Sequence, residues 1–129
     1  MSATELAWAA GFFDGEGSTY IVTTRATEKN KRLNDRKVLC MEIKQADSFV
    51  LERFRDAVEA GTVRGPFRKS SWPDHYKDQW SWELYATSKC IEVYGKLHPY
   101  LSPVKRAQAA MCMDLMEEYQ DSLRRRTYK

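Results

Sequence analysis

Residues 3–17 read ATELAWAAGFFDGEG, and the interpretation of the whole chain starts from this stretch. An apolar run followed by closely spaced glycines predicts a helix of about three turns that is stopped by the glycines of the segment 14–17. Ser2 and Glu5 have the spacing of a capping box at its start. We therefore expect an apolar helix at the amino-terminal end of the fold.

The predicted helix carries a ridge of small side chains. Ala3, Ala7 and Gly11 are four residues apart, so they share one side of the helix, where a second backbone can approach closely. Trp8 and Phe12 also need burial, so the helix is apolar on more than one side. This pattern predicts a helix packed between its own core and a second helix, and a central core helix in a monomer is the alternative.

Two carboxylates, Asp14 and Glu16, follow at the carboxyl end of this helix. The helix dipole is negative there, and an acid costs about 0.3–1 kcal/mol. Lys105 and Arg106 have the opposite problem, because they fall in the first turn of the last predicted helix. A divalent cation would stabilise the acids, and a second copy of the helix would bring two of them together around metal.

The rest of the chain predicts two pairs of strands separated by a helix and followed by two more helices. The four predicted strands are 18–25, 37–45, 62–68 and 79–86. The further helices are predicted to begin at Asp47 or Ser48, at Ser88 and at Ser102-Pro103, with Gly61 ending the first of these three. Directly joined strands are antiparallel. The order α-β-β-α-β-β-α-α predicts an α+β domain, a four-stranded antiparallel sheet with helices on one face.

Alternating side chains indicate which residues form the core. Leu39, Met41 and Ile43 are expected inside, as are Trp80, Trp82 and Leu84. For the last helix the predicted buried stripe is Val104, Ala107, Met111, Leu115 and Leu123.

Length and composition indicate a folded intracellular protein. The 129 residues suit one domain, 1–129, and 43% hydrophobic residues argue against disorder. Neither a secretory signal nor an apolar run of membrane-spanning length is present, so we expect a soluble protein of a bacterial or phage cytoplasm or of an organelle. Three cysteines without C-x-x-C spacing predict inert buried thiols.

Charge is distributed unevenly along the chain. The first 23 residues hold three of the 18 acidic side chains and none of the 21 basic ones. Bases gather in the segments 25–37, 64–69 and 124–126, and the segment 29–37 is predicted to be a polar connection. On the sheet face away from the helices, polar side chains are expected that can contact phosphates or base edges. An ordinary solvated outer face is the alternative.

The segment 9–17, AAGFFDGEG, resembles the nine-residue LAGLIDADG motif of homing endonucleases, with Glu16 at the position of its second acid. The resemblance extends over roughly the whole chain from Leu6 onward. It includes Ile43-Lys44-Gln45, the turn at residues 60–63, and Pro99-Tyr100-Leu101 before Lys105. At Phe49, where some relatives hold a basic residue, this chain has an apolar one.

The resemblance implies a metal-dependent, site-specific endonuclease for double-stranded DNA. Its sheet would saddle the DNA, and its motif helices would form the interface of a homodimer, since the chain carries a single motif. The long target would be pseudo-palindromic, with one strand cut per subunit. Mg²⁺ or Mn²⁺ would be the cofactor, whereas Ca²⁺ is expected to bind without supporting cleavage. The interface residues are expected to be Ala3, Ala7, Trp8, Ala10 and Gly11.

Individual roles also follow from the resemblance. Glu16 would bind metal with the carbonyl of Gly15, Gln45 would lie near the metal, and Lys105 would lie beside the attacking water. Asp14 matches the first acid of the motif and is expected to end the helix without a catalytic role. The expected DNA-binding residues are Ser18, Tyr20, Val22, Thr24, Arg25, Val38, Cys40, Glu42, Lys44, Arg64, Arg68, Gln79, Ser81 and Glu83. In the first strand, polarity alone favours Thr19, Thr23 and Arg25 instead.

Two other functions fit the same residues. One is a non-cleaving DNA-binding regulator or an intron-splicing maturase on the same fold, which would tolerate loss of the acid or the lysine. The other is a plain dimerisation module, which would explain the ridge but not the unfavourably placed charges.

Overall fold

The computed structural model describes residues 2–26 and 35–127, except for the side chains of Arg126 and Thr127. Most of the predicted basic connection 29–37 lies outside these residues. The elements are α1 (Ala3–Glu16), β1 (Gly17–Thr24), β2 (Arg36–Gln45), α2 (Ser48–Val58), β3 (Thr62–Phe67), β4 (Gln79–Tyr85), α3 (Thr87–Leu97), the 3-10 turn η1 (His98–Tyr100) and α4 (Pro103–Thr127).

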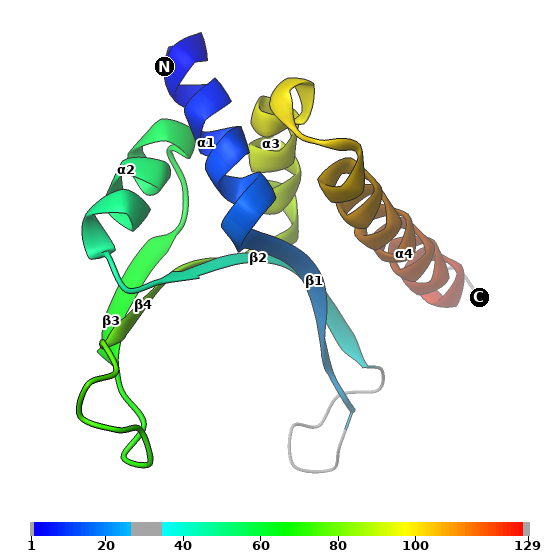
Figure 1. Ribbon diagram of the computed structural model, residues 1–129. Helices are drawn as coiled ribbons and strands as arrows, with labels where there is room; N and C mark the ends of the chain where they lie inside the picture. Colours follow the sequence, from blue (N-terminus) through cyan, green and yellow to red (C-terminus); the bar gives the residue numbers. More distant parts are fainter. Residues whose placement is uncertain (1, 27–34, 128–129) are drawn as a thin grey trace.

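The four strands form one antiparallel sheet in the order β1-β2-β4-β3. Figure 1 shows the sheet as an arch, with all four helices on its convex side and its concave side uncovered. This arrangement confirms the predicted α+β class and the predicted order of elements. None of the helices in the described part of the chain is long and apolar enough to cross a membrane.

The start of α1 follows the prediction, and its end falls at the second glycine of the predicted stop segment 14–17. The Ser2 hydroxyl accepts from the Glu5 amide at 3.1 Å, as a capping residue does. The helix then continues through the two acids and stops only at Gly17, whose amide donates to the Phe13 carbonyl. A side chain at Gly17 would collide with the ring of Phe13, so the close packing of this ring requires glycine there.

The core lies between the sheet and the helices. The ring of Phe54 lies 4.7 Å from that of Trp82, edge to face, and 6.2 Å from that of Phe13. Leu39, Met41 and Ile43 are buried beneath them as predicted, together with Trp82 and Leu84. Trp80 is only half-buried. The three cysteines are buried free thiols, and burial raises the pKa of Cys90 to about 11, as expected for inert groups.

The helix α2 ends earlier than predicted. Asp47 caps its start through a bond from the Phe49 amide at 2.9 Å. Its last residue is Val58, because Glu59 already has the left-handed conformation (φ 57°). Gly61, which was expected to stop the helix, lies in the following turn, where its positive φ and the nearby Trp82 ring favour glycine.

The predicted buried stripe of α4 is wrong. Val104, Met111 and Leu115 are 76%, 61% and 46% exposed, whereas Ala109, Cys112 and Met116 are buried. Ala107 is also exposed, and Leu123 is half-buried. The buried side is the one that faces β1, where the Cys112 thiol lies 3.6 Å from the Thr19 carbonyl.

Candidate nucleic-acid interface and cleavage site

The three residues expected to act in cleavage lie at one end of the sheet. Glu16 is the last residue of α1 and is exposed. Lys105 lies in the first turn of α4, and its amine donates to the carbonyl of Gly17, the residue that follows Glu16, at 2.5 Å. Gly17 pairs with Ile43, so Gln45 follows two residues further along the same end of β2. The fold thus brings together residues that are 88 positions apart in the chain.

Asp14 has a different environment from Glu16. Its carboxylate accepts from the Ser102 amide at 3.1 Å and from the Ser102 hydroxyl at 3.0 Å. Ser102 directly precedes α4, so the acid lies near the positive end of that helix dipole. This contact explains the acid at the end of α1 without metal, and it could not be predicted because Ser102 is 88 positions away in the chain.

The described residues of the chain do not form a metal site by themselves. Among the described residues, no three His, Cys, Asp or Glu side chains are grouped so as to hold a metal ion. The exposed carboxylate of Glu16 and the carbonyl of Gly15 are hard oxygen donors of the kind that Mg²⁺ accepts. These donors suit a divalent cation chemically, but they are too few to hold one without further ligands.

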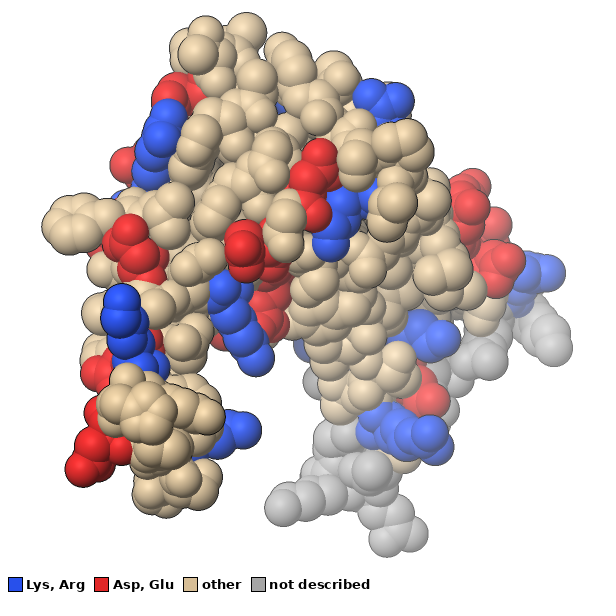
Figure 2. Space-filling model, viewed as in Figure 1, with Lys and Arg blue, Asp and Glu red and all other residues tan. Residues whose placement is uncertain are grey.

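The predicted ridge of α1 is uncovered. Ala3, Ala7 and Gly11 are exposed, and a Cβ atom added at Gly11 or Gly15 would meet nothing within 4 Å among the described residues. The surface over α1 is mostly uncharged (Figure 2). Because this ridge carries no large side chain, a second backbone has room to approach it closely.

Two residues predicted for this interface are placed differently. Ala10 is fully buried in the core, because it lies on the side of α1 that faces the sheet, as Phe13 does one turn later. This expectation was wrong. Trp8 is half-buried, stacked on Phe12 at 5.5 Å and covered on its other side by the Arg53 guanidinium at 3.8 Å.

The structure decides which side of β1 shares the concave face. The Tyr20 hydroxyl donates to Glu42 at 2.7 Å, whereas Thr19 is buried. Ser18, Tyr20, Val22 and Thr24 therefore lie on the same side as the polar residues of β2 and β4, as the resemblance implied. Arg25 is exposed just beyond the strand. Val38 and Gln79 are half-buried.

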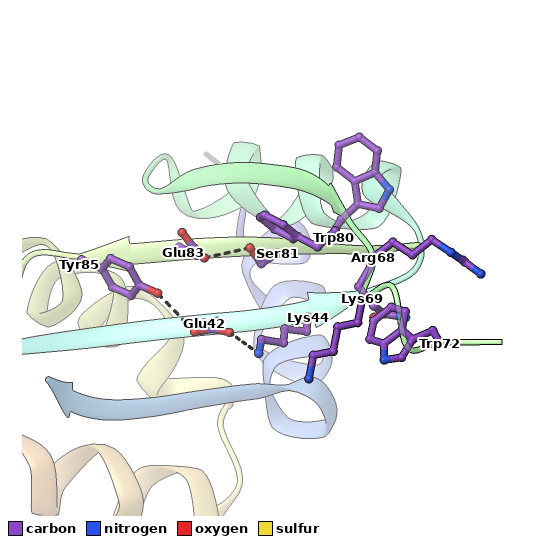
Figure 3. Close-up of a pocket in the computed structure, with 11 residues that line it drawn as sticks. Glu42, Lys44, Arg68, Lys69, Trp72, Trp80, Ser81, Glu83 and Tyr85 are labelled. Carbon is purple, nitrogen blue, oxygen red and sulfur yellow. Dashed lines mark hydrogen bonds and ion pairs between the residues drawn. The ribbon is translucent and has the colours of Figure 1, made fainter. Parts of the chain in front are cut away.

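A row of polar residues crosses the sheet at its centre. Ser18 pairs with Glu42, Glu42 with Glu83, and Glu83 with Thr62. The next row contains Lys44, Ser81 and Arg64. Of these residues, Glu42, Lys44, Ser81 and Glu83 line a hollow of about 530 Å³, together with the end of β3, other residues of β4 and the loop between these two strands (Figure 3).

Glu42 is the centre of one hydrogen-bonded group. It accepts from Tyr20 at 2.7 Å, and the Tyr85 hydroxyl lies at 3.5 Å. The Lys44 amine is 3.4 Å from its other oxygen. In Figure 3, Tyr85 and Lys44 point toward Glu42 from opposite sides. Burial, with the bonds to Tyr85 and Glu42, raises the pKa of Tyr20, so its hydroxyl remains a donor.

Glu83 is the centre of a second group. Its carboxylate accepts from the Ser81 hydroxyl at 3.0 Å and is 3.2 Å from the Arg64 guanidinium. Ser81 and Cys40, both expected to contact DNA, face this side of the sheet but are 2% and 1% exposed. In this conformation neither side chain therefore offers appreciable surface to a ligand.

Arg68 was expected to contact DNA, yet its guanidinium holds the loop between β3 and β4. It donates to the carbonyl of Pro73 at 2.7 Å and to that of Tyr76, and it lies 3.3 Å from Asp78. Three contacts within one loop make this side chain a structural clamp. The side chain is also part of the lining of the hollow.

Four residues of this face were missed by sequence reasoning. Tyr85 continues the alternation of Gln79, Ser81 and Glu83, so its position could have been predicted. The same applies to the exposed Arg36, which begins β2 and alternates with Val38. Lys69 and Trp72 line the hollow from the loop, where no periodic pattern gave a signal.

Comparison with known proteins identifies the fold. No protein-family model matches the chain, and no curated protein matches it in sequence. Among solved structures, the homing endonuclease I-CvuI is similar with a TM-score of 0.69 and 22% identity, over 88% of this chain and 66% of that one. The intron-encoded homing endonuclease I-CeuI is similar with a TM-score of 0.72 and 17% identity, over 96% and 59%.

A third solved structure is that of the LAGLIDADG homing endonuclease I-GzeII, with a TM-score of 0.68 and 15% identity over 91% of this chain and 36% of that one. This chain thus spans less than two thirds of the length of each of the three proteins. At such identities the likeness concerns the fold. Since the expected order of elements and the matched structures agree over nearly the whole chain, the protein has the fold of the LAGLIDADG homing endonucleases.

Proposed function

We propose that this protein is a site-specific endonuclease for double-stranded DNA, which acts as a homodimer with a divalent metal ion. The observation that carries the proposal is the position of Lys105, whose amine reaches the Gly17 carbonyl beside the exposed acid Glu16. A lysine and an acid at one end of an uncovered, arched sheet are what phosphodiester hydrolysis on a duplex requires.

The concave face supports DNA as the substrate. Polar side chains that donate and accept hydrogen bonds cover a curved surface of four strands, and such side chains contact phosphates and base edges. I-CeuI and I-GzeII, which are similar in fold, are described in complex with DNA. In our proposal the expected DNA-binding residues contact phosphates or base edges, with three exceptions. Cys40 and Ser81 are buried, and Arg68 orders the loop between β3 and β4.

In this proposal each residue near the end of α1 has one role in the reaction. Glu16, with the Gly15 carbonyl, would hold Mg²⁺ or Mn²⁺, which supplies charge neutralisation at the phosphate and acidifies a bound water. Lys105 would orient the water and stabilise the departing oxygen by its positive charge. Gln45 would hold the same water by hydrogen bonds. I-CvuI is described on DNA in the presence of Mg and of Ca, which supports divalent metal as the cofactor.

Dimerisation completes the site in this proposal. Two copies of α1, packed along Ala3, Ala7 and Gly11, would bring two Glu16 carboxylates together at the ends of the helices. This accounts for the incomplete set of ligands in the described part of one chain. The target would then be pseudo-palindromic, because a two-fold dimer presents the same sheet to each half.

A non-cleaving regulator or maturase on the same fold is the competing function. The observation that favours it is that same incomplete set of ligands among the described residues. The two functions differ in whether bound DNA is cut.

The test is cleavage of a plasmid library that carries randomised inserts. We expect the protein with Mg²⁺ to linearise a small subset of plasmids that share one long sequence, and EDTA to prevent this. The same sequence cloned alone should then be cut on both strands. Selective binding of plasmids without any cutting in Mg²⁺ or Mn²⁺ would contradict the proposal and support the regulator.

A further inference from the structure

Two acids occupy the centre of the concave face. Glu42 and Glu83 are direct cross-strand partners, and their side chains are only 16% and 19% exposed. Like charges directly opposite each other destabilise a sheet. Their hydrogen-bond partners compensate this repulsion, so the pair is a costly arrangement that a purely phosphate-binding face would not need.

The partners of the acids include two of the expected DNA-binding bases. Lys44 lies 3.4 Å from Glu42, and Arg64 lies 3.2 Å from Glu83. Both bases are more than half exposed, with side-chain exposures of 73% and 61%. Each can therefore still reach a ligand, but its charge is already balanced. Around the arch, red and blue side chains accordingly border the same opening (Figure 2).

Hydroxyl groups fix the orientation of the carboxylates. Tyr20 and Ser81 donate to Glu42 and Glu83 at 2.7 Å and 3.0 Å. An ionised carboxylate can accept about four hydrogen bonds, so both acids, which line the hollow, keep capacity for a further donor there. A carboxylate held in this way accepts from the amino group of cytosine in the major groove, and it repels a phosphate oxygen.

We propose that Glu42 and Glu83 are specificity-determining residues: each accepts a hydrogen bond from the exocyclic amino group of a cytosine in the target, and together they weaken binding to all other duplexes. Discrimination arises because Lys44 and Arg64 are neutralised unless the correct bases engage the acids. The inference rests on the proposed DNA-binding function of this face, and it adds the base that the face reads and the source of its selectivity.

The test compares Glu42→Gln and Glu83→Gln with the unmutated protein, using Glu52→Gln as the matched control. Glu52 is exposed on α2, on the convex side of the sheet, so its replacement removes the same charge away from the concave face. Two quantities are measured for each protein in Ca²⁺: affinity for a random-sequence duplex, and the bases selected from a randomised duplex pool. Thermal melting confirms that each variant is folded.

We expect Glu42→Gln and Glu83→Gln each to bind the random duplex about fivefold more tightly than Glu52→Gln, because one carboxylate no longer repels phosphate. Each variant should also lose about tenfold in its preference for cytosine at one position of each half-site. Tyr20→Phe should reduce the same preference as Glu42→Gln without changing the net charge, which separates orientation of the carboxylate from charge alone.

Two results would overturn the inference. If both glutamine variants bind random DNA like Glu52→Gln and select the same bases as the unmutated protein, the acids do not determine specificity, although the endonuclease proposal stands. If the unmutated protein selects no sequence at all, the proposed function itself fails. Should Glu42→Gln not fold, Glu83→Gln carries the same comparison, because its carboxylate belongs to a separate group.

Discussion

Asp14 and Glu16 are two residues apart at the end of α1, but their surroundings assign them different tasks. Asp14 accepts from both donors of Ser102 and so ties α1 to the start of α4. Glu16 is exposed beside the Lys105 contact. This difference indicates a stabilising role for the first acid, and it is consistent with the chemical role that we propose for the second.

Asp14→Asn should therefore lower stability more than activity. The replacement removes the charge and leaves one of the two acceptor oxygens, so we expect the free energy of unfolding to fall by about 1–2 kcal/mol. Urea denaturation measures this change. Asp56→Asn is the control, since this exposed acid of α2 pairs with its sequence neighbour Arg55 at the surface and should change stability by less than about 0.5 kcal/mol. Equal stability of the two variants would contradict the role of Asp14.

At the scale of elements, the exposed outer side of α1 with its small side chains is a candidate contact surface for a second subunit. Gly11→Ala adds a methyl group that meets nothing within 4 Å in the described part of the chain, and alanine favours a helix over glycine by about 1 kcal/mol. A monomer should thus gain stability. A dimer closely packed along this ridge should instead be weakened, because the methyl groups separate the helices.

Sedimentation at micromolar concentration distinguishes these outcomes. We expect the unmutated protein to be dimeric and Gly11→Ala to shift toward monomer. The exposed Gly95 of α3, which also has open space around it, provides the control, since Gly95→Ala should leave the dimer unchanged. A monomeric unmutated protein would show that α1 is not a subunit interface.

The order of the loop between β3 and β4 is predicted to depend on the side chain of Arg68. Arg68→Ala removes three contacts inside this loop, so amides of residues 70–78 should exchange with solvent about tenfold faster. Arg64→Ala is the matched control, because Arg64 bonds to Glu83 and not to the loop. Unchanged exchange in Arg68→Ala would show that the loop is ordered by other contacts.

The helix α4 illustrates where sequence reasoning reached its limit. Both of its apolar sides have helical spacing: Val104, Met111 and Leu115 on one, Ala109, Cys112 and Met116 on the other. Periodicity cannot choose between two such stripes. The choice depends on contacts with β1, such as that of Lys105 with Gly17, which only the folded chain contains.

At the scale of the whole molecule, the element order and the concave face were predictable because hydrophobic alternation fixes which side of a strand is buried. The first strand is the exception: polarity alone favoured Thr19 on the concave face, whereas the structure buries Thr19 and places Tyr20 beside Glu42, as the resemblance implied. The ion pairs on that face were not predictable. From the sequence Lys44 and Arg64 were expected to contact DNA, and their pairing with Glu42 and Glu83 depends on side-chain positions that exist only in the folded sheet. Likewise the clamp formed by Arg68 depends on carbonyl groups, which a sequence does not position.

The account as a whole depends on Glu16, the exposed acid at the end of α1. Glu16→Gln keeps the size of the side chain but removes the charge that would hold a cation, while the concave face is unchanged. The most direct measurement is magnesium-dependent cutting of the selected duplex by the unmutated protein and Glu16→Gln, with binding to the same duplex measured in parallel. We predict a loss of cutting by more than about a hundredfold with binding retained within about threefold, and a slower rate for Lys105→Met. Full cutting activity in Glu16→Gln would contradict the account.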